Sequence, residues 1–215
     1  MGEKRIKVGI LGGTFDPIHL GHLILASEAM ESFQLDKMLL IPTGHSYLKD
    51  HKEEKVQSSG HRYRMTALAA EQDPRLEVSD IEVKRPGNSY TADTLRELEQ
   101  AHPDWELYYI VGADTLCMMR KWVRPNEIFE RCTILAAQRS DETAPEELEL
   151  EIKSLQDEFH ARILRLPVRN IEISSTDIRG RVRERKSIRY LVSEPVIRYI
   201  YDNKLYCAVN QSTDS

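Results

Sequence analysis

Short apolar runs alternate along most of the chain with segments in which apolar residues recur at helical spacing. Short runs bounded by turn residues are typical of buried strands, whereas a helical period is typical of amphipathic helices. The runs that predict strands are residues 6–11, 38–41, 107–111, 133–137 and 163–167. Residues 76–83 predict a further strand, with one shift in its alternating pattern. Helices are expected to begin near residues 22, 58, 91, 143, 174 and 193.

This alternation predicts an α/β fold that is Rossmann-like and doubly wound, with a mostly parallel sheet and helices on both faces. The length of 215 residues fits a single domain with one substantial core. We therefore expect one domain over residues 1–215, with a small helical portion at residues 174–205. In open sheets of this kind, ligands bind at the carboxyl ends of the strands, so the residues that follow each strand are the functional candidates.

Composition and charge exclude several classes of protein. The net charge of −5 argues against broad binding of nucleic acid, which needs a basic face. The first apolar run is too short for a signal peptide core or a membrane span. Cys117, Cys132 and Cys207 are scattered and lack the spacing of a metal site, so we expect a protein of the reducing cytoplasm.

The segment that follows the first predicted strand carries the strongest candidate chemistry. Gly12 and Gly13 allow a tight turn and close approach of a ligand to the backbone. His19 and His22 are three residues apart at the predicted helix start, which places both rings on the same side. Free backbone N–H groups at a helix start attract phosphate, so the segment suits chemistry on a phosphate group. The alternative is a loop whose histidines only cap or pack.

Residues 12–22, GGTFDPIHLGH, resemble the signature of the nucleotidyltransferase superfamily that carries a His-x-Gly-His motif. Within it, the chain is most similar to the bacterial nicotinate-nucleotide adenylyltransferases. Residues 173–179, ISSTDIR, are similar to a second motif of that family. The resemblance implies that the phosphate of nicotinate mononucleotide attacks the α-phosphorus of ATP, releasing pyrophosphate and forming nicotinate adenine dinucleotide. It also implies Mg²⁺ carried on the ATP phosphates, with no metal ion held by protein ligands.

The resemblance also implies roles for individual residues. The implied catalytic residues are His19, His22, Lys49 and Arg179. The implied ATP contacts are Gly12, Gly13, Thr14, Phe15, His19, His22, Gly112, Asp114, Ser175, Thr176 and Arg179. The implied contacts to the mononucleotide are Asp16, Thr43, Lys52, Tyr90, Thr91 and Trp122.

Several of these residues also have a purely structural interpretation. The family carries its loop lysine in a Pro-Pro-His-Lys context, from which this chain departs: Lys49 fits by distance from the preceding strand and Lys52 by local resemblance. Both lysines could instead belong to a solvated run of charges. Thr91 and Asp114 could each cap a helix, and Trp122 could be a core residue.

Other functions remain open on the sequence. Another adenylyltransferase of the superfamily could use phosphopantetheine or nicotinamide mononucleotide as the acceptor. An aminoacyl-tRNA synthetase fragment is disfavoured by the missing Lys-Met-Ser-Lys-Ser motif, and a dehydrogenase by the missing third glycine after Gly13. A non-catalytic nucleotide sensor would be expected to lack a histidine or the arginine. The expected partners are ATP and nicotinate mononucleotide, without nucleic acid or membrane, in a possible homo-oligomer.

Overall fold

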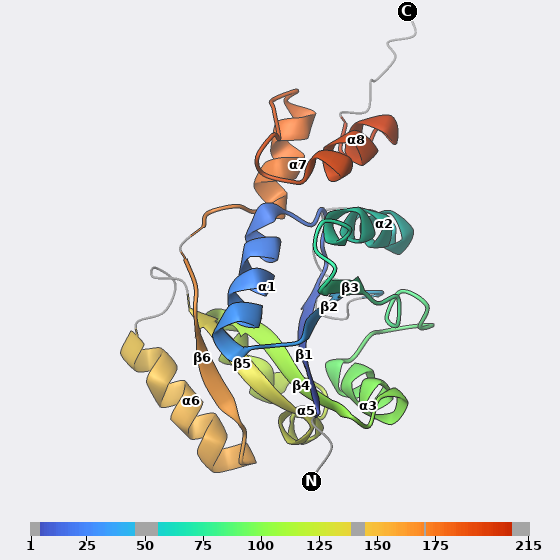
Figure 1. Cartoon of the computed structure of the whole chain (residues 1–215). Helices are drawn as coiled ribbons and strands as arrows, with labels where there is room; N and C mark the ends of the chain where they lie inside the picture. The colour runs from blue at the N-terminus through green and yellow to red at the C-terminus, as the bar shows by residue number, and fades with distance from the viewer. Residues whose placement is uncertain (1–4, 46–55, 139–144, 170, 208–215) are drawn as a thin grey trace, which may run out of the picture.

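The computed structural model describes residues 5–45, 56–138, 145–169 and 171–207, and its centre is a six-stranded sheet (Figure 1). All the paired strands are parallel, in the order β3-β2-β1-β4-β5-β6. Their bounds are β1 Ile6–Gly13, β2 Lys37–Pro42, β3 Leu76–Val78, β4 Trp105–Gly112, β5 Cys132–Gln138 and β6 Ile163–Pro167. The strand order reverses between β1 and β4, and the carboxyl ends of these two strands border the point where such sheets bind ligands. The predicted α/β architecture is confirmed.

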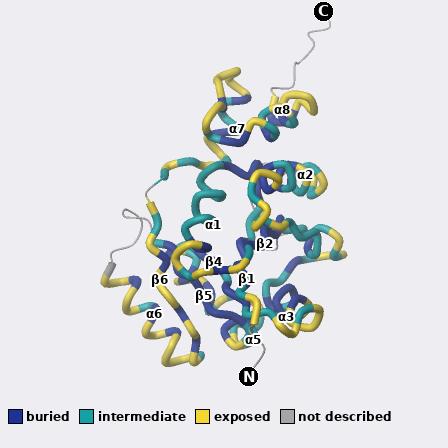
Figure 2. Tube along the Cα trace, viewed as in Figure 1, coloured by how far each residue is buried: buried dark blue, intermediate teal, exposed yellow. Residues whose placement is uncertain are grey.

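Helices cover both faces of the sheet. Their bounds are α1 Leu20–Phe33, α2 Ser59–Ala70, α3 Thr91–Ala101, α4 Ala113–Leu116, the 3₁₀ turn Met119–Lys121, α5 Pro125–Arg131, α6 Pro145–Phe159, α7 Ser175–Arg183 and α8 Glu194–Asp202. In β2, Met38 and Leu40 enter the core under α1, α2, α7 and α8, whereas Leu39 and Ile41 enter the core under α3, α5 and α6. Alternation along one strand therefore supplies both apolar layers. Figure 2 shows that α6 is exposed along its outer side.

The predicted strand over residues 76–83 is wrong beyond Val78. The N–H of Ser79 donates to Leu40 at 3.0 Å, and the chain then leaves the sheet in a series of turns. Ile81 is only partly buried and packs against the core from one of these turns. Its apolar character therefore mimicked the alternation of a strand, because packing from a turn needs the same residue type.

The observed N-caps differ from the expected ones in three places. His19 is the N-cap of α1, so the helix begins before His22. Tyr90 and not Thr91 is the N-cap of α3, and Gly112 and not Asp114 is the N-cap of α4. Ser58, in contrast, caps α2 as predicted by accepting the N–H of His61 at 3.4 Å.

The helix start expected near residue 143 lies outside the described residues, and α6 is described from Pro145. Within the described part of the chain, no helix has the length and apolar character needed to cross a membrane.

Candidate functional site

A buried arginine of α2, Arg62, holds the loop between β1 and α1 in place. Arg62 is only 3% exposed, and its guanidinium donates to the carbonyl oxygens of Thr14 at 2.7 Å, Gln57 at 3.0 Å and Gly44 at 3.1 Å. Burial lowers the pKa of Arg62, although the nearby Asp16 acts to raise it. A guanidinium that binds three carbonyls compensates for the cost of its burial and fixes the loop backbone.

Asp16, in the same loop, is bonded to the protein interior. Its carboxylate accepts from the hydroxyl of Tyr206 at 2.6 Å and from the N–H of Gln57 at 3.3 Å, and the residue is 3% exposed. Its backbone carbonyl accepts from Arg179 at 2.9 Å. These contacts hold the loop against the C-terminal part of the chain. The predicted contact of Asp16 with the mononucleotide stays a prediction.

The two histidines come together at the start of α1. Their rings stack with centroids 3.6 Å apart, which confirms that both lie on the same side. The N–H of His19 donates to Nδ1 of His22 at 3.2 Å. A neutral His22 that accepts at Nδ1 carries its proton on Nε2, so that edge of the ring is a hydrogen-bond donor.

The second motif brings α7 to the same loop. Ser174 caps α7 by accepting the N–H of Asp177 at 3.1 Å, and the hydroxyl of Ser175 donates to the carbonyl of Pro17 at 2.8 Å. Arg179 also donates to the hydroxyl of Thr176 at 3.1 Å. The N-terminal ends of α1 and α7 therefore lie next to each other, as Figure 1 shows, and the His pair belongs to this start of α1. Two helix N-termini with an arginine form a favourable place for an anion.

A cavity of about 260 Å³ lies beside the start of α1. Its lining includes Gly112 at the end of β4 and Asp114 in α4. Gly21 and Leu25 of α1 and Arg169 of the segment before α7 line it as well. The cavity lies next to the junction of two helix starts, and both apolar and polar residues line it. Its volume and lining suit part of a small ligand.

A second cavity, of about 360 Å³, lies between the ends of β1 and β4 and the start of α3. Among the residues that line it are Gly12, Gly13, Thr14, Thr43, Glu82, Ser89, Thr91, Tyr109, Gly112 and Trp122. The half-buried ring of Trp122 meets the ring of Tyr109 edge to face, with centroids 6.4 Å apart. Tyr109 thereby supports an aromatic surface on one side of the cavity.

A buried carboxylate also lines this second cavity. Glu82 is 9% exposed and accepts a hydrogen bond from the hydroxyl of Thr94 at 2.8 Å. Burial raises the pKa of Glu82, although Thr94 and the charge of Arg85 act to lower it. Glu82 thus joins the loop after β3 to the first turn of α3.

The structure brings most of the predicted site residues together, in three adjoining places. The larger of these two cavities is lined by Gly12, Gly13, Thr14, Thr43, Thr91, Gly112 and Trp122. The smaller one is lined by Gly112 and Asp114. The junction of α1 and α7 holds His19, His22, Ser175, Thr176 and Arg179. Phe15, which belongs to the loop between β1 and α1, is buried, and its ring meets the ring of His22 edge to face. Tyr90 is the N-cap of α3 and is not among the residues that line the larger cavity. Lys49 and Lys52 lie outside the described residues.

Sequence reasoning missed Arg62, Glu82, Tyr109 and Tyr206. The sequence did indicate that Arg62 is buried, because it lies three residues before Met65 and seven before Ala69, on the buried face of α2. A charged residue on that face must have partners. The bond between Tyr206 and Asp16 spans 190 residues, and no local pattern could have revealed it.

The described side chains do not supply a protein cage for a metal ion. Among them, no group of three or more His, Cys, Asp or Glu residues is arranged to hold one. The donors around the junction of α1 and α7 are instead backbone N–H groups, hydroxyls, imidazoles and a guanidinium, which suit an anion that carries its own cation.

Comparison with known proteins points to one family. The model of the family described as "Cytidylyltransferase-like" matches residues 10–181. The chain is 42% identical over 200 residues to a probable nicotinate-nucleotide adenylyltransferase of Lachnoclostridium phytofermentans, covering 93% of this chain and 98% of that protein. It is 38% identical over 202 residues to a protein of the same description from Clavibacter michiganensis, covering 94% of each.

A solved structure shares the fold. The nicotinic acid mononucleotide adenylyltransferase of Plasmodium falciparum, complexed with NaAD, superposes with a TM-score of 0.72 at 16% identity. The match covers 93% of this chain and 97% of that one. At this level of identity the likeness supports the arrangement of the sheet and helices.

Proposed function

The chain belongs to the cytidylyltransferase-like family, among its nicotinate-nucleotide adenylyltransferases, and from this membership we propose how its site works. The enzyme transfers the adenylyl group of ATP to nicotinate mononucleotide, and it produces nicotinate adenine dinucleotide and pyrophosphate. One observation carries the proposal: the stacked histidines and Arg179 lie where the starts of α1 and α7 meet, and Gly21 of that same first turn of α1 lines the cavity of about 260 Å³.

In this proposal, ATP occupies the junction of α1 and α7. Its adenosine part enters the cavity of about 260 Å³, where Asp114 is placed to accept from a ribose hydroxyl. Its phosphates lie against the helix starts, where His22, Thr176 and Arg179 donate to them. Mg²⁺ bound to the ATP phosphates neutralises part of their charge and keeps most of its ligands as water.

The mononucleotide occupies the cavity of about 360 Å³. Trp122, supported by Tyr109, stacks on the pyridine ring. The first turn of α3 borders the cavity at Thr91, and its backbone N–H groups bind the ring carboxylate. This arrangement directs the phosphate of the mononucleotide toward the loop that carries the His pair.

The chemistry then requires positioning and charge stabilisation. The phosphate of the mononucleotide attacks the α-phosphorus of ATP, and the bond to pyrophosphate breaks. The attacking phosphate is already anionic near neutral pH, so no general base is needed. His19, His22, Arg179 and a loop lysine, either Lys49 or Lys52, stabilise the negative charge on the transferring group. Holding both substrates in line accounts for the rest of the rate.

A pyrophosphate-release assay with ATP and a panel of acceptors tests this function. The panel contains nicotinate mononucleotide, nicotinamide mononucleotide and phosphopantetheine. We expect kcat/KM for the acid to exceed that for the amide by about tenfold or more, or ~1.4 kcal/mol, because backbone N–H groups at the start of α3 match a carboxylate and not an NH₂ group. Equal use of both, or preference for the amide, would contradict the nicotinate assignment. Absence of pyrophosphate with every acceptor would contradict catalysis and favour a nucleotide sensor.

A further inference from the structure

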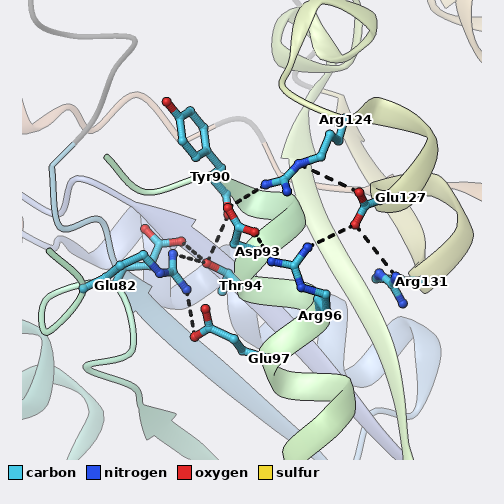
Figure 3. A network of polar contacts seen from close by, with 10 residues as sticks. Glu82, Tyr90, Asp93, Thr94, Arg96, Glu97, Arg124, Glu127 and Arg131 are labelled. Carbon is cyan, nitrogen blue, oxygen red and sulfur yellow. Dashed lines mark hydrogen bonds and ion pairs between the residues drawn. The ribbon is translucent and has the colours of Figure 1, made fainter. Parts of the chain in front are cut away.

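A network of charged side chains joins the first turn of α3 to the segment that precedes α5 (Figure 3). The carboxylate of Asp93, in α3, accepts from the guanidinium of Arg124 at 2.6 Å and also from Arg96. Glu127, in α5, continues the network toward Arg96 at 3.5 Å and Arg124 at 3.9 Å. Asp93 thus receives two guanidinium groups, one from its own helix and one from the other segment.

This connection is close in sequence to two residues that line the larger cavity. Asp93 is two residues after Thr91, and Arg124 is two residues after Trp122. Thr91 and Trp122 both line the cavity, and they come from the two segments that the bond between Asp93 and Arg124 joins. The bond between Asp93 and Arg124 therefore links the two segments that carry these lining residues.

The backbone at Arg124 needs such support. Arg124 has φ 57° and ψ 58°, the left-handed conformation that non-glycine residues rarely adopt. Its side chain contacts Asp93 and Glu127, both from helices. Partial burial acts to raise the pKa of Asp93, but the hydrogen bonds and charges of Arg124 and Arg96 outweigh it and hold the pKa below its ordinary value. Asp93 is thus a charged acceptor wherever the enzyme is folded near neutral pH.

The start of α3 has a second and independent anchor. The hydroxyl of Thr94 donates to Glu82 at 2.8 Å and accepts from Arg85 at 3.0 Å, and Arg85 also pairs with Glu97 at 3.0 Å. These contacts tie α3 to the loop after β3. Loss of the bond between Asp93 and Arg124 should therefore leave α3 and Thr91 in place and release the segment that carries Trp122.

We propose that Asp93 and Arg124 are positioning residues that set the distance between Thr91 and Trp122, and through it the affinity for the mononucleotide. The inference rests on the proposed function, because it takes the larger cavity as the mononucleotide site. Neither residue contacts the reacting atoms. Their contribution is to hold the aromatic ring and the helix start in register with the pyridine ring and its carboxylate.

The test compares Asp93→Asn and Arg124→Ala with Glu99→Gln. Glu99 pairs with Arg131, an ion pair that also joins α3 to α5 but lies eight and nine residues along the chain from the lining residues Thr91 and Trp122. For Asp93→Asn and Arg124→Ala we expect KM for nicotinate mononucleotide to rise about tenfold, with kcat and KM for ATP within about twofold of the wild type. Glu99→Gln should resemble the wild type. Arg124→Lys, which keeps the charge, should recover part of the affinity.

Fluorescence supplies a readout that does not depend on turnover. The chain has two tryptophans, so Trp105→Phe leaves Trp122 as the only one. In that background we expect nicotinate mononucleotide to quench Trp122, with an apparent Kd that rises about tenfold on Asp93→Asn.

The outcomes separate this inference from the proposed function. A wild-type enzyme that releases no pyrophosphate with nicotinate mononucleotide would contradict the function itself. An active wild type with unchanged KM and Kd in Asp93→Asn would overturn the positioning role, as would an equal effect of Glu99→Gln. If Asp93→Asn does not fold, Arg124→Ala decides, because an unchanged KM for nicotinate mononucleotide in that variant would overturn the positioning role.

Discussion

The backbone at His19 orients the ring of His22, and the two rings stack. His19, as the N-cap of α1, has an extended backbone that turns its N–H toward the ring of His22. The resulting bond to Nδ1 leaves the Nε2 edge as the donor. In the proposed mechanism, that edge stabilises charge on the transferring phosphate.

His22→Ala should therefore lower kcat/KM, with a loss of transition-state stabilisation of at least ~2 kcal/mol, the size of one charge-stabilising group. The protein should still fold. Steady-state kinetics and circular dichroism measure the two effects. His102→Ala is the control, because His102 stacks on Trp105 beyond the far end of α3. Normal turnover in a folded His22→Ala variant would remove this residue from the mechanism.

Glu82 makes folding stability depend on pH. Burial raises its pKa above the ordinary value of 4.5, so the folded chain binds this proton more tightly than the unfolded chain. The free energy of unfolding should then fall as the pH rises from 4.5 through the raised pKa.

Glu82→Gln removes that proton. The Tm of this variant minus the Tm of the wild type should increase as the pH rises from 4.5 toward neutrality, as measured by thermal unfolding at several pH values. Glu184→Gln is the control of opposite sign below pH 4.5, since the hydrogen bond from Lys186 lowers the pKa of Glu184 and its contribution to stability is lost only as the pH falls through that lowered pKa. Its slope should be small because Glu184 is exposed. A flat Tm difference for Glu82→Gln would contradict the burial argument.

At the scale of elements, helix α7 is placed by bonds to the loop before α1. Ser175 and Arg179 both donate to backbone carbonyls of that loop, at Pro17 and Asp16. The capping Ser174 leaves the first turn of α7 directed at the same junction. The helix therefore holds the loop, and in the proposed mechanism it also presents donors to the ATP phosphates.

Arg179→Ala should impair use of ATP more than binding of the mononucleotide. A charged hydrogen bond to phosphate is worth about 1.5–3 kcal/mol, so we expect KM for ATP to rise roughly tenfold or more. Arg183→Ala, one turn further along α7, is the matched control. Steady-state kinetics with each substrate varied in turn measures the effect. Unchanged KM and kcat for ATP would leave Arg179 with a structural role alone, in contacts such as those to Asp16 and Thr176.

At the scale of the whole molecule, the C-terminal part of the chain completes the site. Leu205 and Tyr206 belong to the same core cluster as Leu11 and Phe15. The hydroxyl of Tyr206 bonds to Asp16, and burial raises the pKa of Tyr206, which keeps it a protonated donor at working pH. The loop before α1 is thus sandwiched between α2 and the residues after α8.

Tyr206→Phe removes this donor and leaves the buried Asp16 carboxylate with one partner fewer. The free energy of unfolding should fall by about 1–3 kcal/mol, measured by denaturant titration. For a chain of this size, the Tm should fall by roughly 2–4 °C for each kcal/mol lost. Tyr201→Phe is the control, because Tyr201 is 46% exposed. Equal stability of Tyr206→Phe and the wild type would show that the hydrogen bond adds nothing.

Local patterns failed where a residue type serves two structural purposes. Ile81 continued the apolar alternation of β3 although it packs from a turn, and Thr91 looked like an N-cap although Tyr90 takes that position. Thr91 nevertheless lines the larger cavity, so its predicted place at the site is consistent with the structure. A cap is decided by backbone angles, which side-chain chemistry indicates only in part.

The sequence by itself determined the α/β class, the strands that end at functional loops, and the two motifs around His22 and Arg179. It could do so because apolar periodicity and turn residues act over a few neighbouring positions. Only the tertiary structure decided the strand order and the contacts of Arg62, Asp93 and Tyr206. These contacts join residues far apart in the chain, and a charged or hydroxyl side chain does not indicate from its own neighbours which distant partner it will meet.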